Sequence, residues 1–176
     1  MPRKSVLYSN ICPIDSWGGI IMRELKLKPG EKAPEFTLKN QYGQEVSLSS
    51  LKGKKVLLSF HPLAWTGVCE IQMKSLETKF AVLEELNTVA LGLSVDCVPC
   101  KKAWAEHMKV VKTHLLADFW PHGDVAALYG LFIDKLGSSG RANVLIDEKG
   151  NIEWSRVYEM SEIPDLEEVI RVLKGK

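Results

Sequence analysis

Two short, largely apolar runs separated by an amphipathic segment restrict the folds open to this chain more than any other feature. The runs are KKVLLSF, residues 54–60, and TVALGLSVD, residues 88–96. Runs of this kind are typical of strands buried on both faces of a sheet. Between them apolar residues recur at helical spacing, which predicts a helix over residues 68–86. A strand, a helix and a second strand in this order predict a right-handed parallel crossover and therefore an α/β domain.

The remaining segments fit the same architecture. Residues 35–53, EFTLKNQYGQEVSLSSLKG, alternate apolar and polar residues around a polar turn and predict an N-terminal β-hairpin. Together these elements predict a thioredoxin-like sandwich with a central mixed sheet. The further predicted elements are a helix from about Pro99 to Val110, a strand in HLLADF (114–119), a short helix in GDVAALYGLF (123–132), a hairpin over residues 141–158 and a closing amphipathic helix over residues 163–176.

Size and composition indicate one soluble domain. The chain has 176 residues, of which 45% are hydrophobic and 26% are charged. This length suffices for one sizeable core and makes two ordinary domains improbable. A formal net charge of +1 supplies no broad attraction for a phosphate backbone, so we expect no nucleic acid partner. The apolar runs are far shorter than the ~20 residues that a membrane-spanning helix needs, so we expect no membrane insertion.

The N-terminal end differs from the rest of the chain. Residues 1–21 begin with two basic residues, but polar residues and a proline interrupt the apolar core that a secretion signal requires. We interpret residues 1–21 as an extension or the product of a misplaced start codon, and residues 22–176 as the folded domain. Four cysteines are too few for a disulfide-stapled secreted scaffold, which indicates redox, metal or packing roles and a cytoplasmic location.

Cys69 is the best-placed candidate for a reactive group. It falls in the first turn of the helix predicted over residues 68–86, just after the end of a buried strand. In open α/β sheets, ligands tend to bind at the carboxyl ends of the strands. The unpaired N–H groups and the macrodipole of a helix start also stabilise a thiolate relative to a thiol. A small buried hydrophobic side chain is the alternative, but the position favours a nucleophile.

The segment around Cys69 carries a family resemblance. PLAWTGVC has Pro62, Thr66 and Cys69 in the P-x-x-x-T-x-x-C order of the peroxiredoxins, the alkyl hydroperoxide reductase and thiol-specific antioxidant family. The resemblance extends along residues 26–175. It includes the opening hairpin, the middle segment LLADFWPHGDVAALYGLF, and GRANVLIDEKGNI, which resembles the strand that carries the family's active-site arginine.

This resemblance implies a role for each matching residue. Cys69 is the peroxidatic thiol, Thr66 the hydroxyl that holds thiolate and peroxide, Pro62 a shield of the pocket, and Arg141 the fixed cation. During attack, negative charge moves along a line of one sulfur and two oxygens. Donors that are already oriented can stabilise this charge without reorganising. The chemistry needs no metal and no organic cofactor. Without the resemblance, Arg141 would be read as a surface ion pair and Thr66 as a helix cap.

Two positions depart from the family pattern. His61 stands where the family often has an aromatic residue or a threonine, and Gln72 stands where it usually has a glutamate. We hypothesise that His61 lines the pocket rim and makes the rate sensitive to pH between roughly 6 and 7. A side chain packed beside the sheet is the alternative. Trp65 is a candidate apolar wall for an organic hydroperoxide, although large aromatic residues more often belong to the core.

The sulfenic acid formed on Cys69 must condense with a thiol before it is oxidised irreversibly. Cys100 lies in the first turn of the next predicted helix, where it too could ionise, and a parallel crossover brings both helix starts to one sheet edge. We hypothesise that Cys100 resolves Cys69 within one chain after local unwinding, and that Cys97 exchanges onward to a 97–100 disulfide. Direct resolution by Cys97 and a one-cysteine cycle are the alternatives. Cys12 has no partner at informative spacing.

The sequence therefore predicts a thiol peroxidase that reduces hydrogen peroxide and alkyl hydroperoxides. Its expected partners are a thioredoxin-like or glutaredoxin-like reductant and, from the family, a second copy in a homodimer. The competing function is a thiol-disulfide oxidoreductase that acts through Cys97 and Cys100, whose spacing suits dithiol chemistry. A zinc site built from Cys69, Cys97, Cys100 and a histidine is disfavoured, because the sequence has no second cysteine pair.

Overall fold

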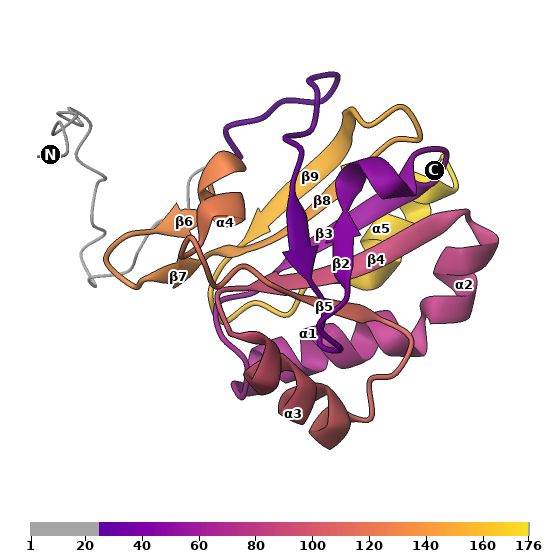
Figure 1. Ribbon diagram of the computed structural model, residues 1–176. Coiled ribbons are helices and arrows are strands. Elements are labelled where there is room, and N and C mark those ends of the chain that lie inside the picture. Colours follow the sequence, from indigo (N-terminus) through magenta and orange to yellow (C-terminus); the bar gives the residue numbers. More distant parts are fainter. Residues whose placement is uncertain (1–24, 176) are drawn as a thin grey trace, which may run out of the picture.

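The computed structural model describes residues 25–175 and is built around one mixed sheet (Figure 1). The strands are β1 (Thr37–Lys39), β2 (Glu45–Ser47), β3 (Lys55–Phe60), β4 (Thr88–Ser94), β5 (His114–Ala117), β6 (Phe132–Ile133), β7 (Ser138–Ser139), β8 (Arg141–Ile146) and β9 (Ile152–Tyr158). The helices are η1 (Leu48–Leu51), α1 (Gly67–Thr78), α2 (Phe80–Glu85), α3 (Val98–Met108), α4 (Asp124–Leu128) and α5 (Leu166–Leu173). The seven-stranded sheet has the order β2-β1-β5-β4-β3-β8-β9, and β6 pairs with β7 separately.

The pairing of the central strands confirms the predicted crossover. β3 and β4 are parallel neighbours, and β5 continues the parallel set on the far side of β4. β8 pairs antiparallel with β3, and β9 pairs antiparallel with β8, so the sheet is mixed as expected. The N-terminal hairpin is formed by β1 and β2. The carboxyl ends of β3 and β4 consequently meet at one edge, where α1 and α3 begin.

One predicted helix is divided into two helices in the structure. The helix expected over residues 68–86 is broken at Lys79, where φ is −95° and ψ is 8°, so that α1 and α2 are separate helices. Leu76 and Leu83 are nevertheless buried in the same core. Their apolar spacing therefore predicted which side chains face inward without revealing the bend between them.

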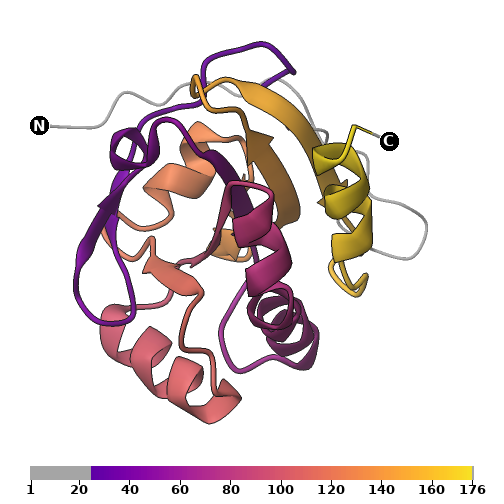
Figure 2. The ribbon, with the colours of Figure 1, turned by 90° about the vertical axis from the view of Figure 1, so that its right-hand side faces the viewer.

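Two apolar cores lie on the two faces of the sheet, because successive strand residues point to opposite sides. Val56, Leu58 and Phe60 of β3 enter the core that contains α4. Leu57 enters the other core, to which α1, α2, α3 and α5 contribute. Figure 2 shows α4 in orange and α5 in yellow on opposite sides of the sheet. Cys69 and Trp104 belong to the second core, so the candidate nucleophile sits within the layer of helices.

Parts of the predicted organisation concern residues outside the described range. The proposed division between residues 1–21 and residues 22–176 falls there, as does Cys12. Within residues 25–175, no helix combines the length and the apolar character needed to cross a membrane.

Candidate active site

Cys69 occupies the position that the sequence predicted. Its side chain lies in the first turn of α1 and is 0% exposed. Residue 66 is the N-cap, so the free N–H groups of the helix start surround this turn. The strand β3 ends at Phe60, and residues 61–66 form the loop that turns the chain from sheet to helix. The positive end of the helix dipole therefore lies beside the Cys69 side chain.

Arg141 lies directly against Cys69, although 72 residues separate them in the chain. It begins β8, whose antiparallel pairing with β3 carries it to the sheet edge where α1 starts. The guanidinium is only 2% exposed, and its Nη2 atom lies 3.5 Å from the Cys69 Sγ atom. Arginine remains charged under all ordinary conditions, so a permanent cation faces the buried sulfur.

Gln72 holds the guanidinium in place. It lies one turn after Cys69 on α1, and its Oε1 atom accepts a hydrogen bond of 2.5 Å from Arg141 Nη1. Its amide nitrogen donates to Ser59 Oγ at 2.8 Å and to the Phe60 carbonyl oxygen at 3.1 Å, which fixes the orientation of the side chain. The sequence identified Gln72 only as a departure from the family pattern. The structure makes it the side-chain partner of Arg141.

The charge of Arg141 is not cancelled by an acid. Its Nη2 atom also donates to the carbonyl oxygen of Met160 at 2.9 Å, and among residues 25–175 no carboxylate forms an ion pair with it. The Nε atom has no hydrogen-bond partner among the described residues. A buried cation with neutral partners is costly, and an anion at Cys69 would relieve that cost.

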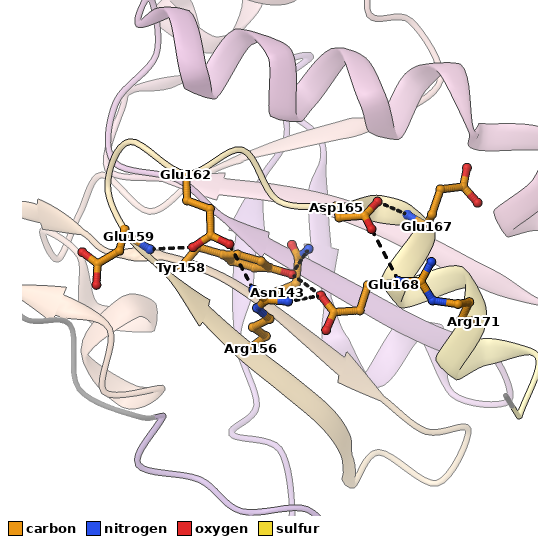
Figure 3. A network of polar contacts seen from close by, with 9 residues as sticks. All are labelled: Asn143, Arg156, Tyr158, Glu159, Glu162, Asp165, Glu167, Glu168 and Arg171. Atoms are coloured by element: carbon orange, nitrogen blue, oxygen red, sulfur yellow. Dashed lines mark hydrogen bonds and ion pairs between the residues drawn. The ribbon is translucent and has the colours of Figure 1, made fainter.

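The segment that supplies Met160 is tied to α5 by a polar network (Figure 3). Arg156 on β9 pairs with Glu162 at 3.0 Å and with Glu168 at 2.7 Å. The Tyr158 hydroxyl donates to Glu168 at 3.5 Å and accepts from Asn143 at 3.4 Å. These contacts lie on both sides of Met160 in the sequence. They restrain the loop whose carbonyl group orients Arg141.

Thr66 and Pro62 lie in the loop before α1. Thr66 is exposed, and its Oγ1 atom donates to the Leu63 carbonyl oxygen at 3.1 Å. It is the N-cap residue by position, but its side chain makes no capping hydrogen bond. The helix-cap role considered for its hydroxyl is therefore wrong, and the oxygen keeps its lone pairs for another donor. Pro62 is half-buried beside this loop.

The prediction that His61 lines the pocket rim is wrong. The side chain is 0% exposed and packs against Trp104, with ring centroids 5.4 Å apart, so it does not line an open rim. Burial, reinforced by the positive charge of Lys101, lowers the pKa of His61 well below its ordinary value. Burial therefore favours the neutral imidazole, which argues against the pH dependence that we hypothesised. The alternative of a side chain packed beside the sheet describes it correctly.

Lys101 is a buried neighbour of His61 that sequence reasoning missed. It belongs to the first turn of α3, is 0% exposed, and places its Nζ atom 3.2 Å from His61 Nε2. Lysine is almost never fully buried without a partner. The available signal was its spacing with Trp104 and Met108, which puts the lysine on the apolar face of the helix.

Cys97 and Cys100 lie at the start of α3, as predicted. Cys97 is the N-cap and Cys100 is in the first turn. Cys69, Cys97 and Cys100 are all free thiols. The expectation that the helix start favours ionisation of Cys100 is wrong, because burial and the nearby charge of Asp96 raise the pKa of its thiol. The Cys100 Sγ atom lies 3.8 Å from Asp96 Oδ1 and donates to it.

Trp65 does not form a buried wall. It is 53% exposed, adopts a positive φ of 64°, and packs its ring against His107 with centroids 5.1 Å apart.

Among residues 25–175, no group of three or more histidine, cysteine, aspartate or glutamate side chains is arranged to hold a metal ion.

Comparisons with known proteins identify the family of this chain. The AhpC/TSA family model matches residues 29–155. Alkyl hydroperoxide reductase E of Mycobacterium tuberculosis is 37% identical over 140 residues, which cover 79% of this chain and 91% of that protein. Peroxiredoxin 2 of Thermoplasma acidophilum is 33% identical over 151 residues, which cover 83% of this chain and 74% of the relative.

Solved structures give the same result. The reduced 2-Cys peroxiredoxin of Plasmodium vivax superposes with a TM-score of 0.77 at 29% identity, covering 83% of this chain and 80% of that one. Enterococcus faecalis AhpC superposes with a TM-score of 0.79 at 26% identity, covering 85% of this chain and 92% of that one. The thioredoxin-like fold and the function predicted from the sequence are thereby confirmed. The chain belongs to the AhpC/TSA family and is a peroxiredoxin, a thiol-dependent peroxidase.

Proposed function

We propose that Cys69 is the thiol that this peroxiredoxin oxidises and that Arg141 is its fixed cation. The observation that carries the proposal is the 3.5 Å approach of Arg141 Nη2 to the Cys69 Sγ atom at the start of α1. The thiolate attacks one peroxide oxygen, a sulfur–oxygen bond forms and the oxygen–oxygen bond breaks. The second oxygen leaves as hydroxide or alkoxide and takes a proton from water. Cys69 becomes a sulfenic acid, and the peroxide is reduced by two electrons.

The guanidinium fits this step because it is oriented before the reaction begins. Gln72 and Met160 supply neutral acceptors, so the positive charge remains available to the sulfur and to the departing oxygen. The Thr66 oxygen can accept a hydrogen bond from the peroxide while the Thr66 hydroxyl continues to donate to the Leu63 carbonyl oxygen. Pro62 contributes no N–H and stiffens the loop, which limits the entry of water.

We propose that Cys100 resolves the sulfenic acid. The Cys100 thiol donates a hydrogen bond to Asp96 and releases its proton to solvent before it reacts. The Cys100 thiolate then attacks the oxidised sulfur, a disulfide forms, and the oxygen takes up a proton and leaves as water. Cys69 is fully buried, so the first turn of α1 must open before the two sulfurs can meet. Cys97, one turn away, can then exchange to give the 97–100 disulfide.

The proposed substrates are hydrogen peroxide and alkyl hydroperoxides, in line with the names of the matching relatives. A thioredoxin-like or glutaredoxin-like dithiol protein is the proposed reductant, and a homodimer is the proposed assembly, by analogy with the family. A cytoplasmic location is proposed as well, because a reducing compartment supplies the dithiol reductants that the cycle requires. The alternative dithiol oxidoreductase is less well supported, because burial and Asp96 raise the pKa of Cys100.

Turnover of hydrogen peroxide with thioredoxin tests the site directly. Cys69→Ser should abolish turnover, because no other described thiol faces a buried cation at hydrogen-bonding distance. Cys100→Ser should keep one rapid oxidation and lose repeated turnover with thioredoxin. Cys97→Ser is the matched control for Cys100→Ser, because it removes the neighbouring thiol and leaves the proposed resolver in place. Full activity in Cys69→Ser would overturn the mechanism.

A further inference from the structure

The buried lysine at the start of α3 has no role in the mechanism described so far. Lys101 is 0% exposed, while the next residue, Lys102, is exposed to solvent. Burying an ammonium group is costly unless the fold provides partners or another use for its charge. No carboxylate among residues 25–175 lies within ion-pair distance of Lys101. The chain therefore keeps an unneutralised positive charge inside the helical layer.

The partner that Lys101 does have is neutral. Its ammonium group can only donate, so His61 Nε2 accepts the 3.2 Å hydrogen bond and the imidazole proton resides on Nδ1. The Nδ1 atom has no partner among the described residues, a cost that the site tolerates. His61 is held from its backbone as well, because its N–H donates to Leu93 and its carbonyl oxygen accepts from Ser139 Oγ. A fixed neutral acceptor orients the ammonium group without cancelling its charge.

The acids nearest to Lys101 are committed to other donors. Asp96 Oδ2 accepts from the Ala64 N–H at 2.8 Å and from the Ser94 hydroxyl at 2.5 Å, and its Oδ1 accepts from Cys100. Asp118, which follows β5, accepts from two backbone N–H groups at the start of α4. Both acids act on Lys101 through space, without a direct contact.

The two thiols of the proposed cycle lie at the same sheet edge as Lys101, because α1 and α3 begin where the parallel strands β3 and β4 end. Cys69 is in the first turn of α1, and Cys100 precedes the lysine on α3. Cys69 also shares a buried core with Trp104, one turn after Lys101 on α3. Burial lowers the pKa of Lys101 to about 8, while the charges of Asp96, Cys100 and Cys69 act in the opposite direction. The amine is therefore mainly protonated at neutral pH.

We propose that Lys101, held by the neutral His61, is a second fixed cation of this site that favours the thiolate of Cys69. This inference deepens the proposed function and rests on Cys69 as the reacting thiol. Lys101 has no direct contact with the sulfur and acts through its field, so it is a positioning residue. Arg141 and Lys101 then have the same arrangement. Neutral acceptors orient each buried cation, and its positive charge remains available to an anion.

The first test measures thiolate formation without peroxide. In the full chain with Cys12→Ser, Cys97→Ser and Cys100→Ser, Cys69 is the remaining thiol. The rate of its alkylation by iodoacetamide, followed against pH, reports its ionisation. Lys101→Met should move the midpoint upward by about one pH unit, because a cation near a thiolate has an effect of this size. Lys102→Met, an exposed change at the next position, should leave the midpoint in place.

A second pair of variants separates charge from packing. His61→Gln keeps a neutral acceptor for Lys101, whereas His61→Glu has the same shape and adds a negative charge. His61→Glu should move the midpoint upward at least as far as Lys101→Met, and His61→Gln should stay near the parent. Equal shifts in the two His61 variants would overturn the proposal, as would a midpoint in Lys101→Met within about 0.3 units of the parent. If circular dichroism shows that Lys101→Met does not fold, the comparison of His61→Glu with His61→Gln tests the proposal instead.

These outcomes are distinguishable from failure of the peroxidase mechanism. Alkylation requires no peroxide and no reductant, so an unshifted midpoint refutes the role of Lys101 and leaves the turnover result for Cys69→Ser standing. Conversely, turnover retained in Cys69→Ser refutes the mechanism whatever the alkylation profile shows.

Discussion

Arg141 contacts Cys69, Gln72 and Met160 together because its guanidinium carries several N–H donors in one rigid plane. A lysine at position 141 would have one compact ammonium group, which could not reach the same three acceptors. The cation alone is therefore not sufficient for the site. Its fork geometry determines where the charge lies relative to the sulfur.

Arg141→Lys should lower kcat/KM for hydrogen peroxide by about 100-fold to 1,000-fold, the usual cost of losing one oriented donor at a developing charge. Stopped-flow fluorescence with peroxide measures the rate. Arg171→Lys, which changes an exposed arginine on α5, is the matched control and should leave the rate unchanged. An Arg141→Lys rate within about threefold of the parent would contradict the importance of the fork.

Resolution by Cys100 should accelerate as the pH rises. Burial and Asp96 raise the pKa of Cys100, so at neutral pH most of its thiol is protonated and unreactive. The rate of the Cys69–Cys100 disulfide should then rise by up to about tenfold per pH unit until the thiol is ionised. Mixing with one equivalent of peroxide, followed by acid quenching and mass spectrometry, measures this rate.

Asp96→Asn provides the matched variant for this pH dependence. The amide oxygen can still accept from the Ala64 N–H, while the charge that opposes ionisation of Cys100 is removed. The rise of the resolution rate should begin at lower pH in this variant. A rate that is independent of pH in the parent protein would exclude Cys100 as the resolving thiolate.

At the level of elements, α3 holds a charge in its apolar face at a cost to stability. Replacing a buried ion by an apolar side chain of similar length is often neutral or stabilising. Lys101→Met should therefore raise the free energy of unfolding by about 1 kcal/mol while it slows alkylation of Cys69. Guanidinium chloride unfolding of the reduced protein measures the change. A loss of more than about 1 kcal/mol would mean that the ammonium group is primarily structural.

The elements were predicted well where the pattern is local. The apolar runs of β3 and β4 indicated the crossover, and α1 begins at Gly67, one residue before the predicted start. The break at Lys79 was not predicted, because Leu76 and Leu83 keep helical spacing across it. The His61–Lys101 contact was not predicted either. It joins residues 40 positions apart, and such pairs depend on how α3 packs on the sheet.

For the whole molecule, oxidation and folding should be coupled. Cys69 is buried in the core shared by α1 and α3, so joining it to Cys100 requires α1 to open locally. Hydrogen exchange of the oxidised protein should be faster than that of the reduced protein in residues 66–72 and 97–101. The sheet strands β3 and β4 serve as the internal control, because their exchange should be unchanged. Unchanged exchange at the start of α1 would exclude resolution by unwinding.

The neutral partners of Arg141 and Lys101 also bear on the redox equilibrium. In the proposed mechanism a thiolate at Cys69 balances buried positive charge in the reduced protein, whereas a disulfide at the same position carries no charge. Oxidation thus removes the counter-ion from a region that water does not reach. The disulfide should consequently have a more oxidising reduction potential than the same bond in an uncharged setting, which favours transfer of its oxidising equivalents to a partner dithiol.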